Sequence, residues 1–568
     1  TARTIGIDVR FLTAQEIGEL WPLCNTDGLV GGIFHPEDGY IQPADLTQAF
    51  AKGARARGAT IYRNTPVVAI EQASSGGWIV KTEKGDITCD HVVSATGNYA
   101  RQTGEMVGLD LPVIPVEHQY LVTEPHPALI ERKKQGLPEM GVLRESDGAW
   151  YLREENNGFI LGPYEKGAPC CYVDGPDPQA EYELFQEDIE RLEPHIEAAM
   201  NRVPAFGEVG IKNAYNGAIA YTPDGNPIIG PAWDLDNFWL NEGHSFGITA
   251  AGGAGWQLAE WIVEGEPTID MLGVEPRRFG DYATKQYLIE KNEEAYSHVF
   301  VIHYPDEERP AARPLRTAPC YERMKERGAV FGQRFGWERP NFFATDGMAQ
   351  EDDWSFRRSR WFEAIRKEVA NTTENVGLLD MTAFAKCRIS GPGAEAFLDH
   401  LVANSLPQSV GGLSLAHALN TRGGVHSEFT IRRESDGSFY LVSAGALQRL
   451  DHDYIRKHMP KDGSVQFTPL TGAHGVLVLG GPKSRQLLER VTTADLSNEA
   501  FRWLTAQDIV VGMAPVNAMR VNFVGELGWE LHHPIEYQNH LFDTLFEAGE
   551  DLGLQPFGIR AMDSMRLE

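Results

Sequence analysis

The order of apolar and polar positions near the start of the chain predicts one helix followed by a β-meander. The helix covers residues 41–57, begins at Pro43 or Asp45 and ends near Gly58. Three short segments rich in β-branched residues follow it and predict strands, at residues 67–71, 78–81 and 87–93. The last strand runs into the small residues of 92–97, where a backbone can approach a flat or phosphorylated ligand.

A second pattern, at residues 241–265, predicts a glycine-dense loop that leads into a helix. Apolar positions recur at helical spacing after Gly252–Gly255, and Gly265 can end the helix. Such a helix start exposes backbone amides and carries about half a positive charge, which stabilises a ligand with a delocalised anion. The glycines alone favour a plain turn between strand and helix, so both interpretations stay open at this point.

The second half of the chain contains an internal sequence repeat, called the internal echo below. Residues 389–398 and 479–488 each read as a strand end, a Gly-Pro turn and a helix start, ninety residues apart. Two such units predict a pseudo-symmetric α+β domain that holds its ligand where the halves meet. Before this domain, residues 275–345 are rich in Pro, Arg and Tyr with little periodicity, which indicates a linker or a small bridging domain.

Composition narrows the possible partners. The 568 residues carry a net charge of −29, which opposes binding to nucleic acid or to an anionic membrane surface. We therefore expect its partners to be small molecules or basic patches on other proteins.

The six cysteines contain no C-x-x-C pair, which suggests a reducing compartment. No apolar run approaches the roughly 18 residues of a membrane span. We also expect both termini to be truncation points within a longer sequence.

Three segments that precede the echoing domain carry a family resemblance. They are the stretches Ile302–Pro310, Arg313–Thr317 and Phe331–Pro340, the last of which contains Phe-Gly-Trp-Glu-Arg-Pro. Together with the glycine-rich helix start and the echo, their order resembles the dimethylglycine and sarcosine dehydrogenase family. The resemblance covers essentially the whole chain.

This resemblance implies a multidomain α/β and α+β protein. A partial FAD-dependent domain of the D-amino-acid-oxidase type is expected at 1–274, a central bridging domain at 275–345, and an aminomethyltransferase-like folate domain at 346–568. No Gly-x-Gly-x-x-Gly fingerprint occurs in the opening residues. The fingerprint, and the histidine that carries covalent FAD in some members, are therefore expected upstream of Thr1. The last small barrel of the folate domain is expected beyond Glu568.

The resemblance also assigns residues to a flavin site. His118 and Tyr151 are the expected catalytic residues, because family members place a histidine and a tyrosine beside the flavin to hold the substrate. Taken alone, each is more typical of a buried core residue. The expected cofactor contacts in this half are Thr96, Gly97, Gly243, His244, Ser245, Gly247 and Gly253.

A folate site is expected in the second half. Glu428, in Gly-Gly-Val-His-Ser-Glu-Phe, falls where aminomethyltransferases have a key aspartate, and Glu530 falls where a glutamate grips the pterin. Phe523 replaces a family tyrosine. The family arginine before Asp563 is Met562 here, so either Arg560 or Arg566 could substitute for it. Without the resemblance, Glu428 and Glu530 read as hairpin surface charges.

The predicted activity is oxidative demethylation of dimethylglycine or sarcosine, with FAD as oxidant and tetrahydrofolate as one-carbon acceptor. Two alternative functions are a folate-dependent aminomethyl or methyl transferase with a vestigial flavin half, and a non-enzymatic folate-binding protein.

The electron acceptor is expected to be an electron-transfer flavoprotein or oxygen. The expected location is a bacterial cytoplasm, or the mitochondrial matrix in a eukaryote. A metal site at His532 and His533 is not expected, since no companion ligands lie at metal spacing.

Overall fold

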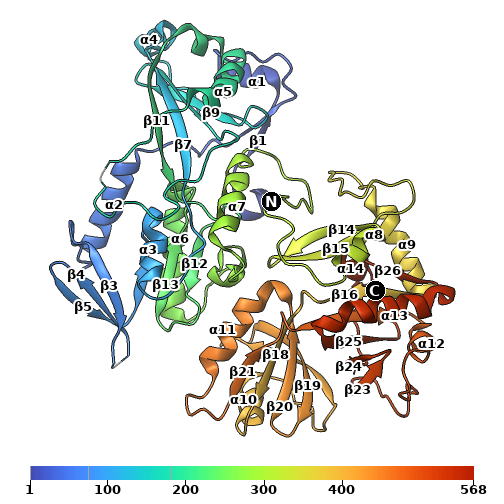
Figure 1. Cartoon of the computed structure of the whole chain (residues 1–568). Coiled ribbons are helices and arrows are strands. Elements are labelled where there is room, and N and C mark those ends of the chain that lie inside the picture. The colour runs from blue at the N-terminus through green and yellow to red at the C-terminus, as the bar shows by residue number, and fades with distance from the viewer. Residues whose placement is uncertain (1, 75, 181, 568) are drawn as a thin grey trace. The chain divides into compact units, whose positions relative to one another are not determined.

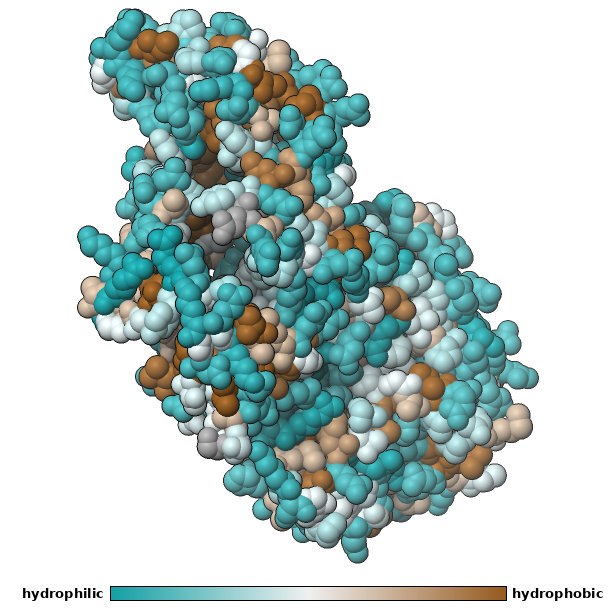
Figure 2. Space-filling model, turned by 60° about the vertical axis from the view of Figure 1, so that its left-hand side comes forward, coloured by the Kyte–Doolittle hydropathy of each residue, from teal (hydrophilic) through white to brown (hydrophobic). Residues whose placement is uncertain are grey.

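The computed structural model describes residues 2–74, 76–180 and 182–567 (Figure 1). The chain divides into two compact units. Unit 1 comprises Thr1–Pro231, Asn237–Glu275 and Thr284–His303, and unit 2 comprises Ala232–Asp236, Pro276–Ala283 and Tyr304–Glu568. Within the described ranges, every helix is too short or too polar to cross a lipid bilayer. The surface in Figure 2 is mostly hydrophilic with separate apolar patches.

A five-stranded antiparallel sheet forms one half of unit 1 (Figure 1). In sheet order its strands are β11 (Ile211–Ile219), β7 (Val116–Thr123), β10 (Gly158–Pro163), β9 (Trp150–Glu155) and β8 (Leu143–Glu145). One face packs against α5 (Ile189–Arg202) through a core of buried apolar residues that includes Leu121, Trp150, Leu152, Phe159, Leu161 and Leu192. Because strand side chains alternate between faces, the other face presents His118, Tyr120 and Tyr151.

The other half of unit 1 contains two three-stranded sheets. One has the order β12 (Ile228–Pro231), β13 (Phe238–Glu242) and β6 (Val92–Ser94), with β13 and β6 parallel, and it contacts α6 (Gly247–Glu264). The second is the meander β3 (Val67–Gln72), β4 (Trp78–Thr82) and β5 (Gly85–Cys89). The remaining elements are β1 (Arg10–Leu12), α1 (Ala14–Leu20), β2 (Gly32–Phe34), α2 (Pro43–Ala56), α3 (Ala100–Glu105), α4 (Pro127–Lys134) and α7 (Lys285–Ser297).

Several local predictions for unit 1 are confirmed and two are wrong. The helix at 41–57 is confirmed as α2, and Gly265 ends α6 with φ of +82°. The single strand predicted at 87–93 is wrong, because β5 completes the meander whereas β6 pairs with β13 in another sheet. Helix α6 begins at Gly247 rather than after Gly252–Gly255, so those glycines lie inside the helix.

Unit 2 contains two larger sheets. The first has the order β23 (Ala506–Val511), β24 (Ala514–Met519), β25 (Gly528–Pro534), β22 (His474–Gly480), β16 (Val376–Asp380) and β26 (Leu554–Pro556). The second has the order β18 (Leu413–Leu419), β19 (Val425–Ser435), β20 (Ser438–Ser443), β17 (Ala385–Ser390) and β21 (Gln466–Pro469). The helices are α8 (Tyr321–Glu326), α9 (Trp361–Glu374), α10 (Ala394–Leu401), α11 (Gln448–His458), α12 (Ser484–Leu488), α13 (Gln538–Gly549) and α14 (Ile559–Arg566).

The internal echo is confirmed in the geometry of unit 2. Strand β17 turns at Gly391 into α10, and β22 turns at Gly481 into α12. Both glycines adopt a positive φ, +116° and +127°. A Cβ at either position would meet a backbone carbonyl oxygen at 2.4 Å, that of Ser464 or of Thr372. The two Gly-Pro turns are therefore equivalent positions that only glycine can occupy without strain.

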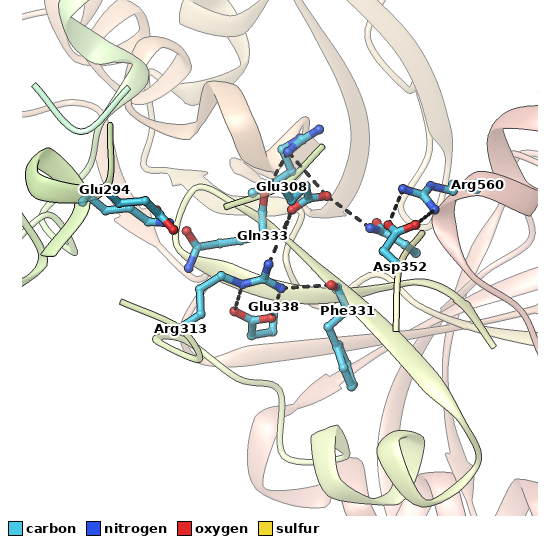
Figure 3. Close-up of polar contacts among 11 residues, drawn as sticks. Glu294, Glu308, Arg313, Phe331, Gln333, Glu338, Asp352 and Arg560 are labelled. Atoms are coloured by element: carbon cyan, nitrogen blue, oxygen red, sulfur yellow. Dashed lines mark hydrogen bonds and ion pairs between the residues drawn. The ribbon is translucent and has the colours of Figure 1, made fainter. Parts of the chain in front are cut away.

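The Phe-Gly-Trp-Glu-Arg-Pro marker has a structural role. It forms the turn and second strand of a hairpin, β14 (Ala329–Arg334) and β15 (Trp337–Phe343), in which Phe335 and Gly336 both adopt a positive φ. Glu338 binds Arg313 through two hydrogen bonds of 2.6 and 2.9 Å, and the same guanidinium reaches the carbonyl oxygen of Phe331 at 3.0 Å (Figure 3). The marker thus anchors the segment around Arg313 to the hairpin.

Replacing Gly481 by alanine should destabilise unit 2. The new methyl group would press on the carbonyl oxygens of Thr372 and Asn375 at a backbone angle that alanine disfavours, at a cost of about 2 kcal/mol or more. Thermal unfolding followed by fluorescence measures the effect. Gly472→Ala is the matched control, since a Cβ added there would have nothing within 4 Å, and equal midpoints for the two variants would contradict the prediction.

Candidate functional sites

The open face of the five-stranded sheet brings the two predicted catalytic residues together. Cross-strand register places Gly162 between Tyr120 on β7 and Tyr151 on β9. The Tyr151 ring lies over Gly162, where a Cβ atom would come within 2.3 Å of its hydroxyl oxygen. This face forms the floor of a cleft of about 980 Å³, lined by residues that include Tyr40, Tyr120, Tyr151, Arg153, Asn213 and Tyr215.

His118 lies on the same sheet face as Tyr120 and precedes it by two residues on β7. Its Nδ1 is 2.9 Å from the hydroxyl oxygen of Tyr296, and its ring centroid is 4.9 Å from that of Tyr164. Burial lowers the pKa of His118 to about 4, so the imidazole is neutral at physiological pH. Among the described residues Nε2 has no hydrogen-bond partner, which leaves that nitrogen for a ligand.

The loop between β13 and α6 has the features of a cofactor site. Gly243 adopts φ of +70°, and a Cβ there would lie 2.6 Å from Thr222 Cγ2. His244 Nε2 is 2.7 Å from Asn241 Oδ1, whereas Nδ1 is buried without a partner in the described structure. Ser245 is fixed by a 3.0 Å bond to the carbonyl oxygen of Gly225. An orphaned buried nitrogen beside the start of α6 fits a ligand that the fold is built to hold.

Further along, α6 leaves open space at two of the predicted contacts. A Cβ added at Gly253 would have nothing within 4 Å, and one added at Gly247 would have His244 Cβ as its nearest neighbour, at 3.7 Å. Phe246 and Ile248, at the helix start, are each 44% exposed. This exposed apolar edge next to backbone amides suits an aromatic ring system with a polar rim, and hence a flavin.

Thr96 and Gly97 are organised by a carboxylate that sequence reasoning missed. Buried Glu242 accepts hydrogen bonds from the Ser94 hydroxyl, the Thr96 amide and hydroxyl, and the Gly97 amide, at 2.7–3.0 Å. These amides are therefore not available to a ligand. Gly97 still has φ of +60°, and a Cβ added there would have nothing within 4 Å, so a ligand can approach its Cα side.

Glu530 is a buried carboxylate with little protein support. It lies on β25 with 3% of its surface exposed. Its one hydrogen-bond partner in the described structure is His532 Nε2, at 3.1 Å, and His532 Nδ1 lies 3.2 Å from the Tyr440 hydroxyl oxygen. Burial raises the pKa of Glu530 to about 8 and lowers that of His532. A ligand with two parallel N–H donors would supply what this carboxylate lacks.

Of the residues expected around Glu530, Phe523 and Arg566 lie next to each other, whereas Arg560 binds a different residue. The Phe523 ring is 5.9 Å from that of Phe384, and the Arg566 guanidinium lies 5.2 Å from the Phe523 centroid. Arg560 instead forms a bidentate ion pair with Asp352, at 2.7 and 3.1 Å (Figure 3). Arg566 is therefore the arginine that accompanies Phe523.

Glu428 lies on the solvent-facing side of β19. It forms a cross-strand pair with His417 on β18, with Nε2 to Oε2 at 3.0 Å, and half of its side chain is exposed. The neighbouring Ser427 points inward and donates to Asp451 at 2.7 Å. The structure thus gives Glu428 an exposed carboxylate, which a bound molecule could reach from solvent.

Comparison with known proteins defines the class. Residues 1–261 match the FAD dependent oxidoreductase family, 264–318 the FAD dependent oxidoreductase central domain, and 320–568 the GCVT N-terminal domain. The chain is therefore an FAD-dependent oxidoreductase fold joined to an aminomethyltransferase-type fold. This confirms the fold class expected from the sequence.

Three characterised relatives narrow the class to a family. Dimethylglycine dehydrogenase, mitochondrial, of Mus musculus is 37% identical over 98% of this chain and 64% of that protein. Sarcosine dehydrogenase, mitochondrial, of Homo sapiens is 32% identical over 100% and 66%. The 4-methylaminobutanoate oxidase (formaldehyde-forming) of Paenarthrobacter nicotinovorans is 31% identical over 99% and 68%. The chain belongs to the dimethylglycine and sarcosine dehydrogenase family, and spans about two thirds of the length of these relatives.

Glu242→Gln should destabilise unit 1. The amide nitrogen of glutamine donates, so it would face groups that also donate, and the hydrogen bonds lost cost about 1–3 kcal/mol. Thermal unfolding would show a lower midpoint for this variant than for Glu264→Gln, an exposed position at the end of α6. Indistinguishable midpoints would show that the Glu242 contacts contribute no stability.

Proposed function

We propose that the protein catalyses oxidative N-demethylation of an N-methyl amino acid, with dimethylglycine or sarcosine as the favoured substrate. FAD is the oxidant, and tetrahydrofolate takes the one-carbon unit as 5,10-methylenetetrahydrofolate. The observation that carries the proposal is the shared sheet face of His118 and Tyr151. A neutral imidazole with an unpaired Nε2 lies on this face, and the Tyr151 hydroxyl, held over Gly162, lies on the same face and lines the cleft.

These two residues can hold an N-methyl amino acid. Bound FAD supplies a hydride acceptor for the methyl carbon. His118 Nε2 can accept an N–H of the amine, and the Tyr151 hydroxyl can donate to the carboxylate. The start of α6 and the orphaned Nδ1 of His244 suit the polar rim of the flavin. The cleft is larger than dimethylglycine requires, so longer N-methyl amino acids belong to the same substrate class.

The proposed folate site centres on Glu530. Tetrahydrofolate supplies the two nitrogens that condense with a carbon at the oxidation level of formaldehyde. Glu530 accepts the amino group and ring N–H of the pterin, while Phe523 and Arg566 offer a flat apolar surface with a cation beside it. Glu428 provides the second carboxylate, for proton transfer near the reacting nitrogens.

The electron acceptor and location complete the proposal. Electrons pass to an electron-transfer flavoprotein or to oxygen. A bacterial cytoplasm is proposed, with the mitochondrial matrix as the equivalent compartment in a eukaryote. Two of the relatives carry the word mitochondrial in their names, and both compartments keep thiols reduced, as the free cysteines suggest.

Anaerobic mixing of the flavin-loaded protein with dimethylglycine or sarcosine tests both halves. Bleaching of the flavin band at about 450 nm is expected, and added tetrahydrofolate should suppress free formaldehyde. Glu428→Gln and Glu530→Gln should release formaldehyde while the flavin still bleaches. Glu526→Gln, at a neighbouring loop position, is the matched control. Folate affinity without bleaching would instead support a transferase or a non-enzymatic folate-binding protein.

Folate binding should release a proton near neutral pH. Because the pKa of Glu530 is raised to about 8 by burial, the empty site is mostly protonated at pH 7. Two N–H donors favour the ionised form, so binding lowers that pKa and affinity rises with pH until about pH 8. Calorimetry in two buffers of different ionisation enthalpy counts the proton. Wild type should release nearly one proton for each folate bound, and Glu530→Gln should release none. Equal proton counts for the two proteins would show that Glu530 is not part of the folate site.

A further inference from the structure

The two large sheets of unit 2 meet at a line of three polar side chains. Tyr440 comes from β20 in the second sheet, whereas Glu530 and His532 come from β25 in the first. Each of the three has at most 3% of its surface exposed. Tyr440 belongs to the same buried cluster as Met519, which pairs with Glu530 across β24 and β25. The place where the two halves of the repeat meet is therefore both buried and polar.

His532 lies between the other two residues. Its Nε2 is 3.1 Å from Glu530 Oε2, and its Nδ1 is 3.2 Å from the Tyr440 hydroxyl oxygen. Both neighbours can take either role in a hydrogen bond. A carboxyl group donates when it is protonated and only accepts when it is ionised, and a phenol hydroxyl can donate or accept. The ring of His532 must therefore match whichever form Glu530 adopts.

The surroundings limit His532 to a single ring proton. Burial lowers the pKa of His532 well below its usual value, and the positive charges of Lys386 on β17 and Arg432 on β19 lower it further. On β22, His474 stacks on Tyr440 with 5.8 Å between ring centroids. Burial lowers the pKa of His474 to about 4, so it adds no charge. Burial also raises the pKa of Tyr440, which keeps its hydroxyl protonated.

One ring proton between two such neighbours allows two arrangements. When Glu530 is protonated, its O–H donates to Nε2, and the ring proton on Nδ1 donates to the Tyr440 oxygen. When Glu530 is ionised, an N–H at Nε2 donates to the carboxylate, and Nδ1 accepts the Tyr440 hydroxyl. The change from the first to the second moves the Glu530 proton to Nε2 and removes the proton from Nδ1. One proton leaves in total, and no cationic ring forms.

We propose that His532 is a positioning residue of the folate site, and that it exchanges one tautomer for the other when a pterin binds to Glu530. This inference rests on the proposed function. A protonated Glu530 directs its O–H to His532 and has one good acceptor oxygen left, whereas the ionised form accepts at both oxygens. The N–H at Nε2 takes one lone pair of Oε2. Oε1 and the other lone pair of Oε2 remain for the two N–H donors of the pterin.

The next residue on β25, His533, provides an internal reference. Its Nδ1 is 2.8 Å from the carbonyl oxygen of Leu531. A carbonyl oxygen can only accept, so the ring proton of His533 is on Nδ1 whether or not folate is bound. Because side chains alternate along a strand, His533 also points to the sheet face opposite that of His532. Its tautomer should therefore stay constant.

The first test reads the tautomer of His532 from ring ¹⁵N chemical shifts in the histidine-labelled full chain at pH 7, with and without 5-formyltetrahydrofolate. Because burial raises the pKa of Glu530 to about 8, the free protein should show His532 protonated at Nδ1. The complex should show it protonated at Nε2, while His533 stays protonated at Nδ1 in both. His532→Leu and His533→Leu assign the signals. The same His532 tautomer in both states, or a doubly protonated ring, would overturn the inference.

The second test is the affinity for 5-formyltetrahydrofolate, measured by calorimetry. His532→Leu should bind about 10-fold more weakly than wild type, because the ionised carboxylate loses a charge-assisted donor. His533→Leu, which removes a buried imidazole from the same strand, should keep the wild-type affinity. Equal affinities for His532→Leu and wild type, or equal losses in both variants, would overturn the role of His532 alone. A wild-type protein that binds no folate would overturn the folate half of the proposed function as well.

Discussion

Burial of carboxylates without a neighbouring cation is the constraint around which both units are organised. A buried carboxylate is costly unless donors satisfy it, and three such groups differ in how many donors the protein provides. Glu242 has four, from Ser94, Thr96 and Gly97. Glu165 has two and Glu530 has one. The fully satisfied group holds the fold together, whereas the least satisfied one is the best candidate to bind a ligand.

The scaffold places these groups with strand alternation and with glycines. Alternation on β7 sends Gln119 and Leu121 into the core under α5 and sends His118 and Tyr120 to the opposite face of the sheet. Gly162 leaves room for Tyr151 on that cleft face. In unit 2 the Gly391 and Gly481 turns repeat one β-turn-α unit. Rigid sheets thus carry the chemical groups, while the loops that follow the strands carry the contacts expected for the cofactor.

Sequence patterns predicted the elements that depend on local signals. The helix α2, the glycine stop of α6 and the paired Gly-Pro turns all follow from residue types within a few positions. The resemblance supplied the family and fold class, and it placed His118 and Tyr151, which the sheet brings together. The roles of these two residues, and those of Glu428 and Glu530, stay predictions.

The missed features depend on partners far apart in the chain. Glu242 binds Thr96, Tyr296 binds His118, and Arg560 pairs with Asp352. No local sequence pattern indicates such contacts.

The central claim is that a buried carboxylate with too few donors from the protein binds a ligand. Glutamate ¹³C-carboxyl NMR, with and without a tetrahydrofolate analogue, tests it most directly. The pKa of Glu530 should be near 8 in the empty site and fall when the analogue binds, and an identical titration in both states would contradict the account.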